Sequence, residues 1–497
     1  MGEALLVRRG GGVSNVVNSI IEEYLAQTGS INANTFVEFC GSTIQLNSTD
    51  ITNNPTTNTF RAISCYAIAI NETYAVLLLS NRDYDANYTY GYAISIKLTD
   101  NTVSVVTTIK INNYGFDEVN WTEICGAKVE DTNYIVATTH SRGTYSVILL
   151  LFSIDYSTGV LSYVSKTDVS AMGNVGDDSK ITALGQGNFL LSSIADCNST
   201  NVRCDYVVFS VSSTGVVTIK QNTSYPIKWY VAGQFPNNNG VIGVVSPSKV
   251  ILASATKLSD NLISAYVSVY NIADNGTITE DISTRIPLIP NNENIASRLY
   301  SSTEIVKEKE FLVSIQLETF KQSGTTGGTT ALWGFMRILY DNSSQKLVIS
   351  KISCLNYYVN RNTIGDVQKI NEHRFIGFFG NPLDKTKYVG SNSIYLFEIY
   401  VSNSGIHFSE PVLLENIYDE YSHKVSHPYC LCGNKLLYIS QATKNSDGGA
   451  TSGKCIITLL QPSPTQIKPS EVAIDGLLQS TATTTKAGKV ALLKGVE

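Results

Sequence analysis

The chain has 497 residues, enough for several domains or for one large repeat architecture. Charged residues make up 16% of it, against roughly 25% in an ordinary soluble domain, and the formal net charge is −6. This balance excludes the clustered Lys and Arg of a nucleic-acid-binding surface, and the 43% hydrophobic content excludes general disorder.

The first segment combines an apolar start, a basic pair and a glycine run, MGEALLVRRGGG. Because the apolar start before the basic pair is too short for the apolar region of an export signal and is followed by glycines, the pattern does not match such a signal, and we expect a chain made in a cytoplasm. From Val13 to Thr28 apolar residues recur at helical spacing, with Ser14 as N-cap and Gly29 as C-cap. This spacing predicts a short helix within an attachment segment at residues 1–33. Its apolar stripe would pack on the rest of the chain or on a partner.

A short apolar strand then recurs seven times, and this period is the strongest signal in the sequence. The copies begin at Ala75, Tyr134, Phe189, Val250, Phe311, Phe375 and Leu436. Their spacing is 55 to 64 residues. Apolar runs of this length are far shorter than the roughly 20 residues of a membrane-spanning helix.

Each unit carries three further strand signals around the apolar one. One strand precedes it, as at Cys65 and Cys125, a third follows it, as at Tyr92, and a fourth alternates polar and apolar residues, as at Thr102. Gly-containing turns such as Ser157-Thr158-Gly159 separate the third strand from the fourth. Seven units of four strands predict a seven-bladed, all-β propeller over residues 34–462.

The last unit lacks a fourth strand, because its third strand runs into Pro462 and Pro464. The segment from Asn34 to Leu46 alternates like the other fourth strands but has no unit of its own. We therefore expect it to complete blade seven and close the ring, which removes an exposed sheet edge.

The final segment, residues 463–497, is expected to form a small β extension. It contains IDGLLQSTATTTKAGKVALLKG, in which small residues lead to a closing apolar strand at Lys489 to Leu493. Together with the MGEALLVRRGGG start, this end resembles the termini of tail-fibre-like proteins of phages and prophages of Gram-positive bacteria. The resemblance covers about 40 residues. It implies a virion structural protein, present in several copies, whose termini dock on other virion proteins and whose propeller is displayed outward.

The residues of enzymes and metal sites do not form a recognisable pattern. His423, His427, Cys430 and Cys432 are close enough in sequence for a zinc site to be conceivable. Cysteines recur in other first strands, however, so small buried side chains are the preferred interpretation. The segment Ser323–Gly328 lacks the Lys of a phosphate loop, and neither GxSxG, HExxH nor an Asp-box occurs. We predict no catalytic residues, no metal and no cofactor.

One end of the propeller is nevertheless a candidate ligand surface. In every blade the second-to-third-strand loop and the connector to the next blade lie at the same end, and here those second-to-third loops are long, as at residues 442–453. The connectors contribute aromatic side chains, which can stack on sugars. The candidates are Trp121, Trp229, Tyr230, Tyr357, Tyr358, Tyr418 and Tyr421. Packing of these rings over the blade ends is the competing interpretation.

The sequence therefore predicts a non-enzymatic virion protein, tail-fibre-like or tail-associated, whose propeller binds a host-surface glycan or decorates the particle. It would be made in the host cytoplasm and would bind neither nucleic acid nor membrane interior. Two alternatives stay open: a protein-binding propeller scaffold outside a virion, and a glycan-cleaving propeller enzyme, since the propeller fold supports catalysis in other proteins.

Overall fold

A computed structural model describes the chain in segments. The described residues are 5–7, 13–15, 21–40, 43–50, 62–83, 88–99, 102–114, 124–140, 147–172, 177–197, 201–221, 224–230, 241–257, 262–290, 295–298, 303–307, 309–319, 330–350, 352–360, 364–380, 393–402, 405–409, 411–416, 421–424, 429–446, 449–462, 464–470 and 476–492. They are almost entirely β-strand. The described helices are two short 3₁₀ turns, η1 (Ile111–Tyr114) and η2 (Ser170–Met172), and none of the described helices is long and apolar enough to cross a membrane.

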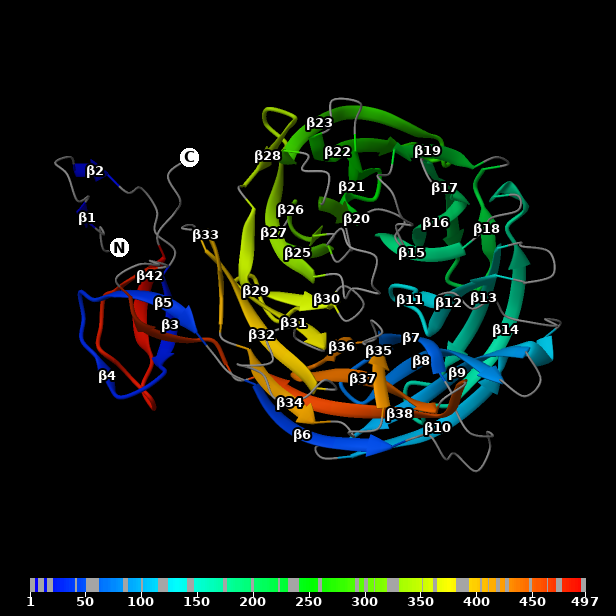
Figure 1. The fold of residues 1–497 in the computed structure, drawn as a ribbon, viewed down its shortest axis with the longest axis horizontal. Helices are drawn as coiled ribbons and strands as arrows, with labels where there is room; N and C mark the ends of the chain where they lie inside the picture. Colours follow the sequence, from blue (N-terminus) through cyan, green and yellow to red (C-terminus); the bar gives the residue numbers. More distant parts are fainter. Residues whose placement is uncertain are drawn as a thin grey trace.

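Seven small sheets are arranged in a ring, which confirms the seven-bladed propeller (Figure 1). Blade one contains β7 (Ala62–Ala69), β8 (Tyr74–Asp83), β9 (Tyr88–Leu98) and β10 (Val103–Lys110). Blade two contains β11 (Cys125–Lys128), β12 (Tyr134–His140), β13 (Val147–Ile154) and β14 (Leu161–Asp168). Blade three contains β15 (Asp177–Gly185), β16 (Asn188–Cys197), β17 (Asn201–Val211), β18 (Val217–Ile219) and β19 (Tyr225–Tyr230). Blade four contains β20 (Val241–Ser246), β21 (Lys249–Lys257), β22 (Leu262–Ile272) and β23 (Ile278–Pro290).

The remaining blades have divided inner or outer strands. Blade five contains β24 (Ile295–Arg298), β25 (Thr303–Lys307), β26 (Glu310–Thr319), β27 (Thr330–Asp341), β28 (Lys346–Ile349) and β29 (Ser353–Asn360). Blade six contains β30 (Ile364–Lys369), β31 (Arg374–Gly380), β32 (Ser393–Ser402), β33 (Gly405–Phe408) and β34 (Val412–Asn416). Blade seven contains β35 (Tyr421–Lys424), β36 (Tyr429–Cys432), β37 (Lys435–Ser446), β38 (Gly449–Pro462) and β6 (Thr43–Asp50).

The inner strands close the ring. In order β7, β11, β15, β20, β25, β30 and β36, each contacts the inner strand of the next blade, and β36 returns to β7. The second strands are covered on both faces by neighbouring blades, and this explains their continuous apolar sequence: Ala75 to Leu79 are fully buried. The outer strand β14 instead alternates between exposed and covered side chains, as expected at a rim.

The turns between third and fourth strands need residues with a left-handed backbone. Gly159, Gly215 and Gly276 have φ values of 75°, 78° and 85°. A side chain at these positions would be strained, so the glycines of the predicted turns are explained by backbone conformation. We call the end of each blade that carries these turns the short-turn end.

The opposite end, where second and third strands meet, differs from the sequence prediction. The expected loop at residues 442–453 is largely a continuous hairpin, because β37 and β38 remain paired as far as Ser446 and Gly449. β8 and β9 likewise stay paired to Asp83 and Tyr88. Asn, Ser and Thr residues continue the backbone ladder here, although Asn is disfavoured in strands, so polar composition alone wrongly predicted loops. We call this end the long-hairpin end.

Blade seven is closed by a strand from the beginning of the chain, which confirms the predicted closure. β6 pairs antiparallel with β38, with Thr43 opposite Pro462 and Asp50 opposite Ile456. The pairing residues begin later than expected, however. The earlier part of the predicted strand, β5 (Phe36–Cys40), leaves the propeller and joins a second structure.

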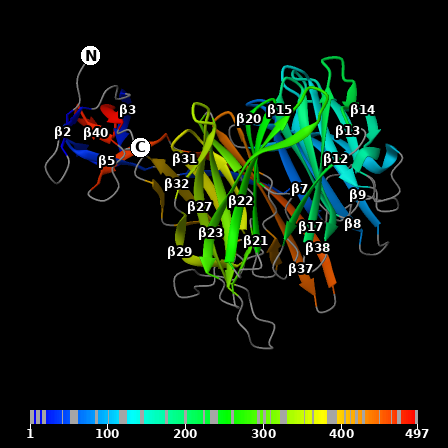
Figure 2. The ribbon, with the colours of Figure 1, turned by 90° about the horizontal axis from the view of Figure 1, so that it is seen from above.

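That second structure is a small closed barrel built from both ends of the described chain. Its strands, in order, are β3 (Ile21–Ala26), β39 (Gln466–Pro469), β5, β40 (Gly476–Leu478) and β42 (Gly488–Leu492). Two short pairs accompany it: β4 (Ser30–Ile31) with β41 (Ala482–Thr483), and β1 (Leu5–Val7) with β2 (Val13–Asn15). Figure 2 shows the barrel strands β3, β5 and β40 beside the propeller.

The helix predicted from Val13 to Thr28 is wrong for the described residues. Strands β2 and β3 occupy Val13–Asn15 and Ile21–Ala26, and residues 16–20 lie outside the description. β3 pairs with β39 and β42, more than 400 residues away in sequence, and the pairing exposes Glu23 while burying Ala26. Partners so distant in sequence override the weak helical spacing of a short apolar segment.

Candidate functional site

The aromatic residues proposed as ligand contacts can be placed only by their strands. Trp229 and Tyr230 lie in β19, opposite Val202 and Asn201 of β17, and so beside the β16–β17 connection at the long-hairpin end. Strand β19 therefore places both residues at the long-hairpin end, while their side chains lie outside the description.

The other candidates follow the same distribution. Tyr357 and Tyr358 lie in β29, which pairs with the first half of β27, and Tyr421 lies in β35 opposite Lys444 of β37. These strands too are at the long-hairpin end. Trp121 and Tyr418 lie outside the described residues, so the structure brings five of the seven candidates to one end of the ring and leaves their contacts untested.

The histidine and cysteine cluster considered for zinc is divided by the fold. His423 pairs with Ala442 in β37, whereas Cys430 pairs with Leu437, five residues along the same strand. At roughly 3.3 Å per residue the two positions are about 16 Å apart, too far for ligands of one zinc ion. Cys430 and Cys432 are buried with their sulfur atoms 3.7 Å apart. Among the described residues, no three His, Cys, Asp or Glu side chains are grouped for a metal.

Among the described residues, the most deeply buried carboxylates of the propeller are paired with arginines. Glu398 of β32 accepts hydrogen bonds from Arg374 of β31 and from the Tyr400 hydroxyl. Glu310 of β26 forms an ion pair with Arg337 of β27. Both carboxylates are therefore engaged by partners within their own blades.

The Arg374–Glu398–Tyr400 group also contacts the barrel. Tyr400 is buried in the apolar core of the barrel, together with Val37, Phe39 and Ile467. Burial, with the nearby Glu398 carboxylate, raises the pKa of its hydroxyl far above the ordinary range, and burial raises the pKa of the adjacent Cys40 thiol to about 12. Neither group is a nucleophile at neutral pH. Because Tyr400 bonds to Glu398 of blade six and its ring lies in the barrel core, the group joins the barrel to the propeller.

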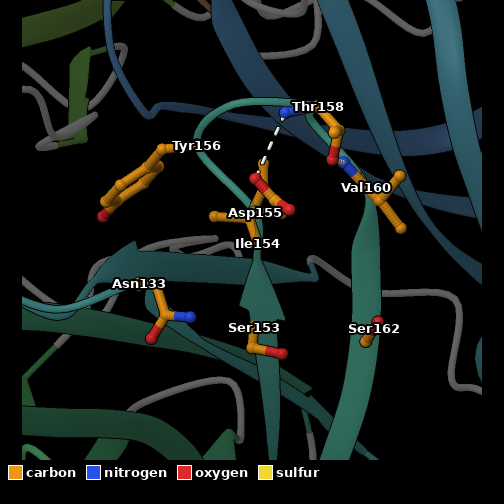
Figure 3. Close-up of a pocket in the computed structure, with 8 residues that line it drawn as sticks. All are labelled: Asn133, Ser153, Ile154, Asp155, Tyr156, Thr158, Val160 and Ser162. Carbon is orange, nitrogen blue, oxygen red and sulfur yellow. Dashed lines mark hydrogen bonds between the residues drawn. The ribbon is translucent and has the colours of Figure 1, made fainter.

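The short-turn end of blade two carries an open hollow lined by described residues. It has a volume of about 620 Å³ and lies beside the β13–β14 turn (Figure 3). Its lining residues are Asn133, Ser153, Ile154, Asp155, Tyr156, Thr158, Val160 and Ser162. A neighbouring hollow of about 530 Å³ shares Asn133 and Tyr156 and adds Lys128, Asp131, Thr132 and Ser213. Tyr156 therefore stands between two open, polar surfaces.

The turn that carries Tyr156 is held by its own aspartate. The Asp155 carboxylate accepts hydrogen bonds from the Ser157 hydroxyl at 2.6 Å and from the backbone N–H groups of Ser157 and Thr158 at 2.7 and 3.2 Å. These bonds, the Ser157 hydroxyl first, lower the pKa of Asp155. The carboxylate therefore stays ionised at neutral pH and cannot donate a proton to a substrate.

Sequence reasoning missed this hollow. Its residues come from the β11–β12 turn, the end of β13, the following turn and the start of β14, and each looks like an ordinary turn or rim residue. The sequence predicted the turn Ser157-Thr158-Gly159, and the aromatic Tyr156 directly before it was the one available signal.

No family model matches the sequence, and no curated protein matches it. Solved structures are similar only at low identity. The α-L-arabinofuranosidase of Fusarium graminearum is 5% identical, with 87% of this chain and 98% of that chain covered and a TM-score of 0.38. Sqt1 of Saccharomyces cerevisiae is 10% identical, with 85% and 100% covered and a TM-score of 0.38. The N-terminal domain of Nup159 is 9% identical, with 88% and 98% covered and a TM-score of 0.35. These likenesses assign no function to the chain.

Proposed function

We propose that the chain is a non-enzymatic structural protein of a phage virion, tail-fibre-like or tail-associated. In this proposal the barrel attaches the chain to other virion proteins. The long-hairpin end of the propeller binds a glycan on the host surface. The proposal of a virion protein is based on the resemblance of the two termini. The assignment of attachment to the barrel and of glycan binding to the long-hairpin end is based on the position of the barrel.

The position of the barrel is the observation that carries the proposal. Within the described residues the barrel meets blade six at the short-turn end: Phe39 stacks on His373 with ring centroids 4.9 Å apart, and Asn371 donates a hydrogen bond to the Thr465 hydroxyl at 2.8 Å. Tyr400, at the same end, enters the barrel core. An attachment made through the barrel would therefore leave the opposite, long-hairpin end directed away from it.

The composition of that opposite end supports a sugar ligand. The connector strands β19, β29 and β35 carry Trp229, Tyr230, Tyr357, Tyr358 and Tyr421. Aromatic rings offer an apolar face to the C–H groups of a sugar, and Tyr and Trp add a hydrogen-bond donor.

The glycan proposal is tested with the full chain and purified Gram-positive cell walls, with and without their attached anionic polymers. We expect sedimentation with the walls, weakened about tenfold by Trp229→Ala or Tyr358→Ala, as for an interface hot spot. Val348→Ala changes an exposed residue of blade five and serves as the control, with no expected effect. Unchanged binding by both aromatic variants would place the ligand elsewhere, and release of reducing ends from the walls would indicate the enzyme alternative.

The virion proposal is tested separately by gold-labelled antibodies against this chain on purified phage particles. Label at one fixed position of the particle is the expected result. A chain found only in the soluble fraction of the lysate would support the alternative of a protein-binding scaffold outside a virion.

A further inference from the structure

The hollow on blade two contains an aromatic ring that is fixed in place but still open to solvent. Tyr156 is 40% exposed, and its hydroxyl donates a hydrogen bond to the Thr132 carbonyl oxygen. The Lys128 ammonium lies 5.2 Å from the ring centre and itself donates to the Ile70 carbonyl oxygen at 3.1 Å. Because the turn and the side chain are already ordered, a ligand that stacks on the ring loses little further conformational entropy.

Polar side chains with unused hydrogen-bonding capacity surround the ring. Within the described part of the chain, Asn133, Ser153 and Ser162 make no side-chain hydrogen bond. Ser153 and Ser162 are direct cross-strand partners, so their side chains lie on the same face of the sheet, about 5 Å apart. Figure 3 shows Asn133 and Tyr156 on one side of the end of β13 and Ser162 with Val160 on the other.

The size and chemistry of the hollow select a class of ligand. Its volume, about 620 Å³, falls in the range of about 300–1,000 Å³ of small-molecule sites. Val160, 46% exposed, adds apolar surface beside hydroxyl and amide groups. A ligand that has both a C–H face and several hydroxyls fits this mixture. The ionised Asp155 carboxylate disfavours an anionic ligand, since Lys128 is already engaged with Ile70 and Tyr156.

We propose that the hollow binds a neutral oligosaccharide that spans the end of β13, with one sugar ring stacked on Tyr156 beside Asn133 and a neighbouring ring hydrogen-bonded to Ser153 and Ser162. Asp155 is the one carboxylate in its lining and is committed to the turn, so the site binds and does not hydrolyse.

This site is distinct from the glycan surface of the proposed function and does not rest on it. It lies at the short-turn end, whereas the connector strands lie at the long-hairpin end. It is also well separated from the barrel: blade two is on the side of the ring opposite blade six, which carries the barrel (Figure 1). A ligand can therefore reach it without displacing the barrel.

The test uses the full chain and three trisaccharide probes: maltotriose and triacetylchitotriose, which are neutral, and sialyllactose, which is anionic. Saturation-transfer NMR and calorimetric titration should detect at least one neutral probe and a weaker anionic one. Tyr156→Ala should weaken the neutral probe about tenfold, and Asn133→Ala about threefold. Tyr156→Phe keeps the ring and should retain most of the affinity.

Two controls separate this site from structural effects and from the other surface. Thermal unfolding should show that the variants remain folded, and Tyr358→Ala should leave trisaccharide binding unchanged. The proposal is overturned if neither neutral probe binds, if sialyllactose binds as tightly as the neutral probes, if Tyr156→Ala binds like the wild type, or if Tyr156→Phe loses as much as Tyr156→Ala. Loss with Tyr358→Ala alone would instead support the long-hairpin surface.

Discussion

Blades one and two differ from blades five and six at one repeated position, the first residue of the second strand. In the former it is a tyrosine that reaches the next blade: Tyr74 donates a hydrogen bond to the Ser157 carbonyl oxygen at 3.2 Å, and Tyr134 packs beneath Gly215. In the latter it is charged, and Glu310 and Arg374 pair within their own blade. The same backbone site therefore joins neighbouring blades in blades one and two and ties a single blade together in blades five and six.

The two ion pairs have the same geometry with opposite polarity. Arg374 lies opposite Tyr400 and bonds to Glu398, two residues away; Glu310 lies opposite Leu339 and bonds to Arg337, again two residues away. The turns agree with this difference. A side chain at Gly159 would overlap the Tyr74 ring, whereas no described atom lies within 4 Å of one at Gly405 in blade six.

Breaking the blade-six pair should have the largest effect. Glu398→Ala leaves Arg374, which is fully buried, without its counter-charge, and should lower the free energy of unfolding by about 3–5 kcal/mol in denaturant titrations. Glu310→Ala should cost less, because Arg337 is 21% exposed and can reach water.

The double variant Arg374→Met with Glu398→Leu is the matched control. It removes both charges and should recover much of the lost stability, since no uncompensated charge remains. A double variant no more stable than Glu398→Ala would mean that lost packing, and not the uncompensated charge of Arg374, causes the loss of stability.

A methyl group in the blade-two turn should have the next largest effect. Gly159→Ala combines a left-handed backbone with overlap on the Tyr74 ring and should cost about 2–4 kcal/mol of unfolding free energy. Gly405→Ala has the backbone cost without the overlap and should cost about 1–2 kcal/mol. Equal losses in thermal unfolding would contradict the inter-blade role assigned to Tyr74.

These particulars show why the sequence predicted the ring better than its junctions or its site. The second strands are buried on both faces, so their apolar runs repeat visibly at about sixty residues, and their turn glycines mark the hairpins. The barrel was missed because β3 and β39 pair across more than 400 residues. The pairing of Arg374 with Glu398 was not predicted, since nothing local in the sequence indicates that they meet. Asn133 and Tyr156 are brought together only by strand pairing.

Removing the hydroxyl of Tyr74 tests the hydrogen bond between blades one and two, and a smaller effect is expected than for the changes above. Tyr74→Phe keeps the ring but loses the hydrogen bond to Ser157, and should cost about 0.5–1.5 kcal/mol of unfolding free energy. Tyr134→Phe is the matched control, because the contact of Tyr134 with Gly215 is one of packing, and it should be close to neutral. A larger loss for Tyr134→Phe than for Tyr74→Phe would mean that the hydroxyl of Tyr134, and not that of Tyr74, makes the stabilising hydrogen bond between blades.

The smallest expected effect concerns a feature that blades two and five share. Asp341 in blade five closes its turn as Asp155 does in blade two, accepting bonds from the Ser343 hydroxyl and backbone N–H, and also from the Ser344 hydroxyl. These bonds, led by the Ser343 hydroxyl, lower the pKa of Asp341 from 3.8 to about 2. A carboxyl whose pKa is lower in the folded state stabilises it fully above pH 3.8 and loses that contribution as the pH falls toward 2. Ser343→Ala should raise the pKa toward 3.8, measured from the carboxyl carbon shift of Asp341 against pH, whereas Ser162→Ala should leave it unchanged. A wild-type value already at 3.8 would show that this turn, unlike the one at Asp155, is not held by its carboxylate.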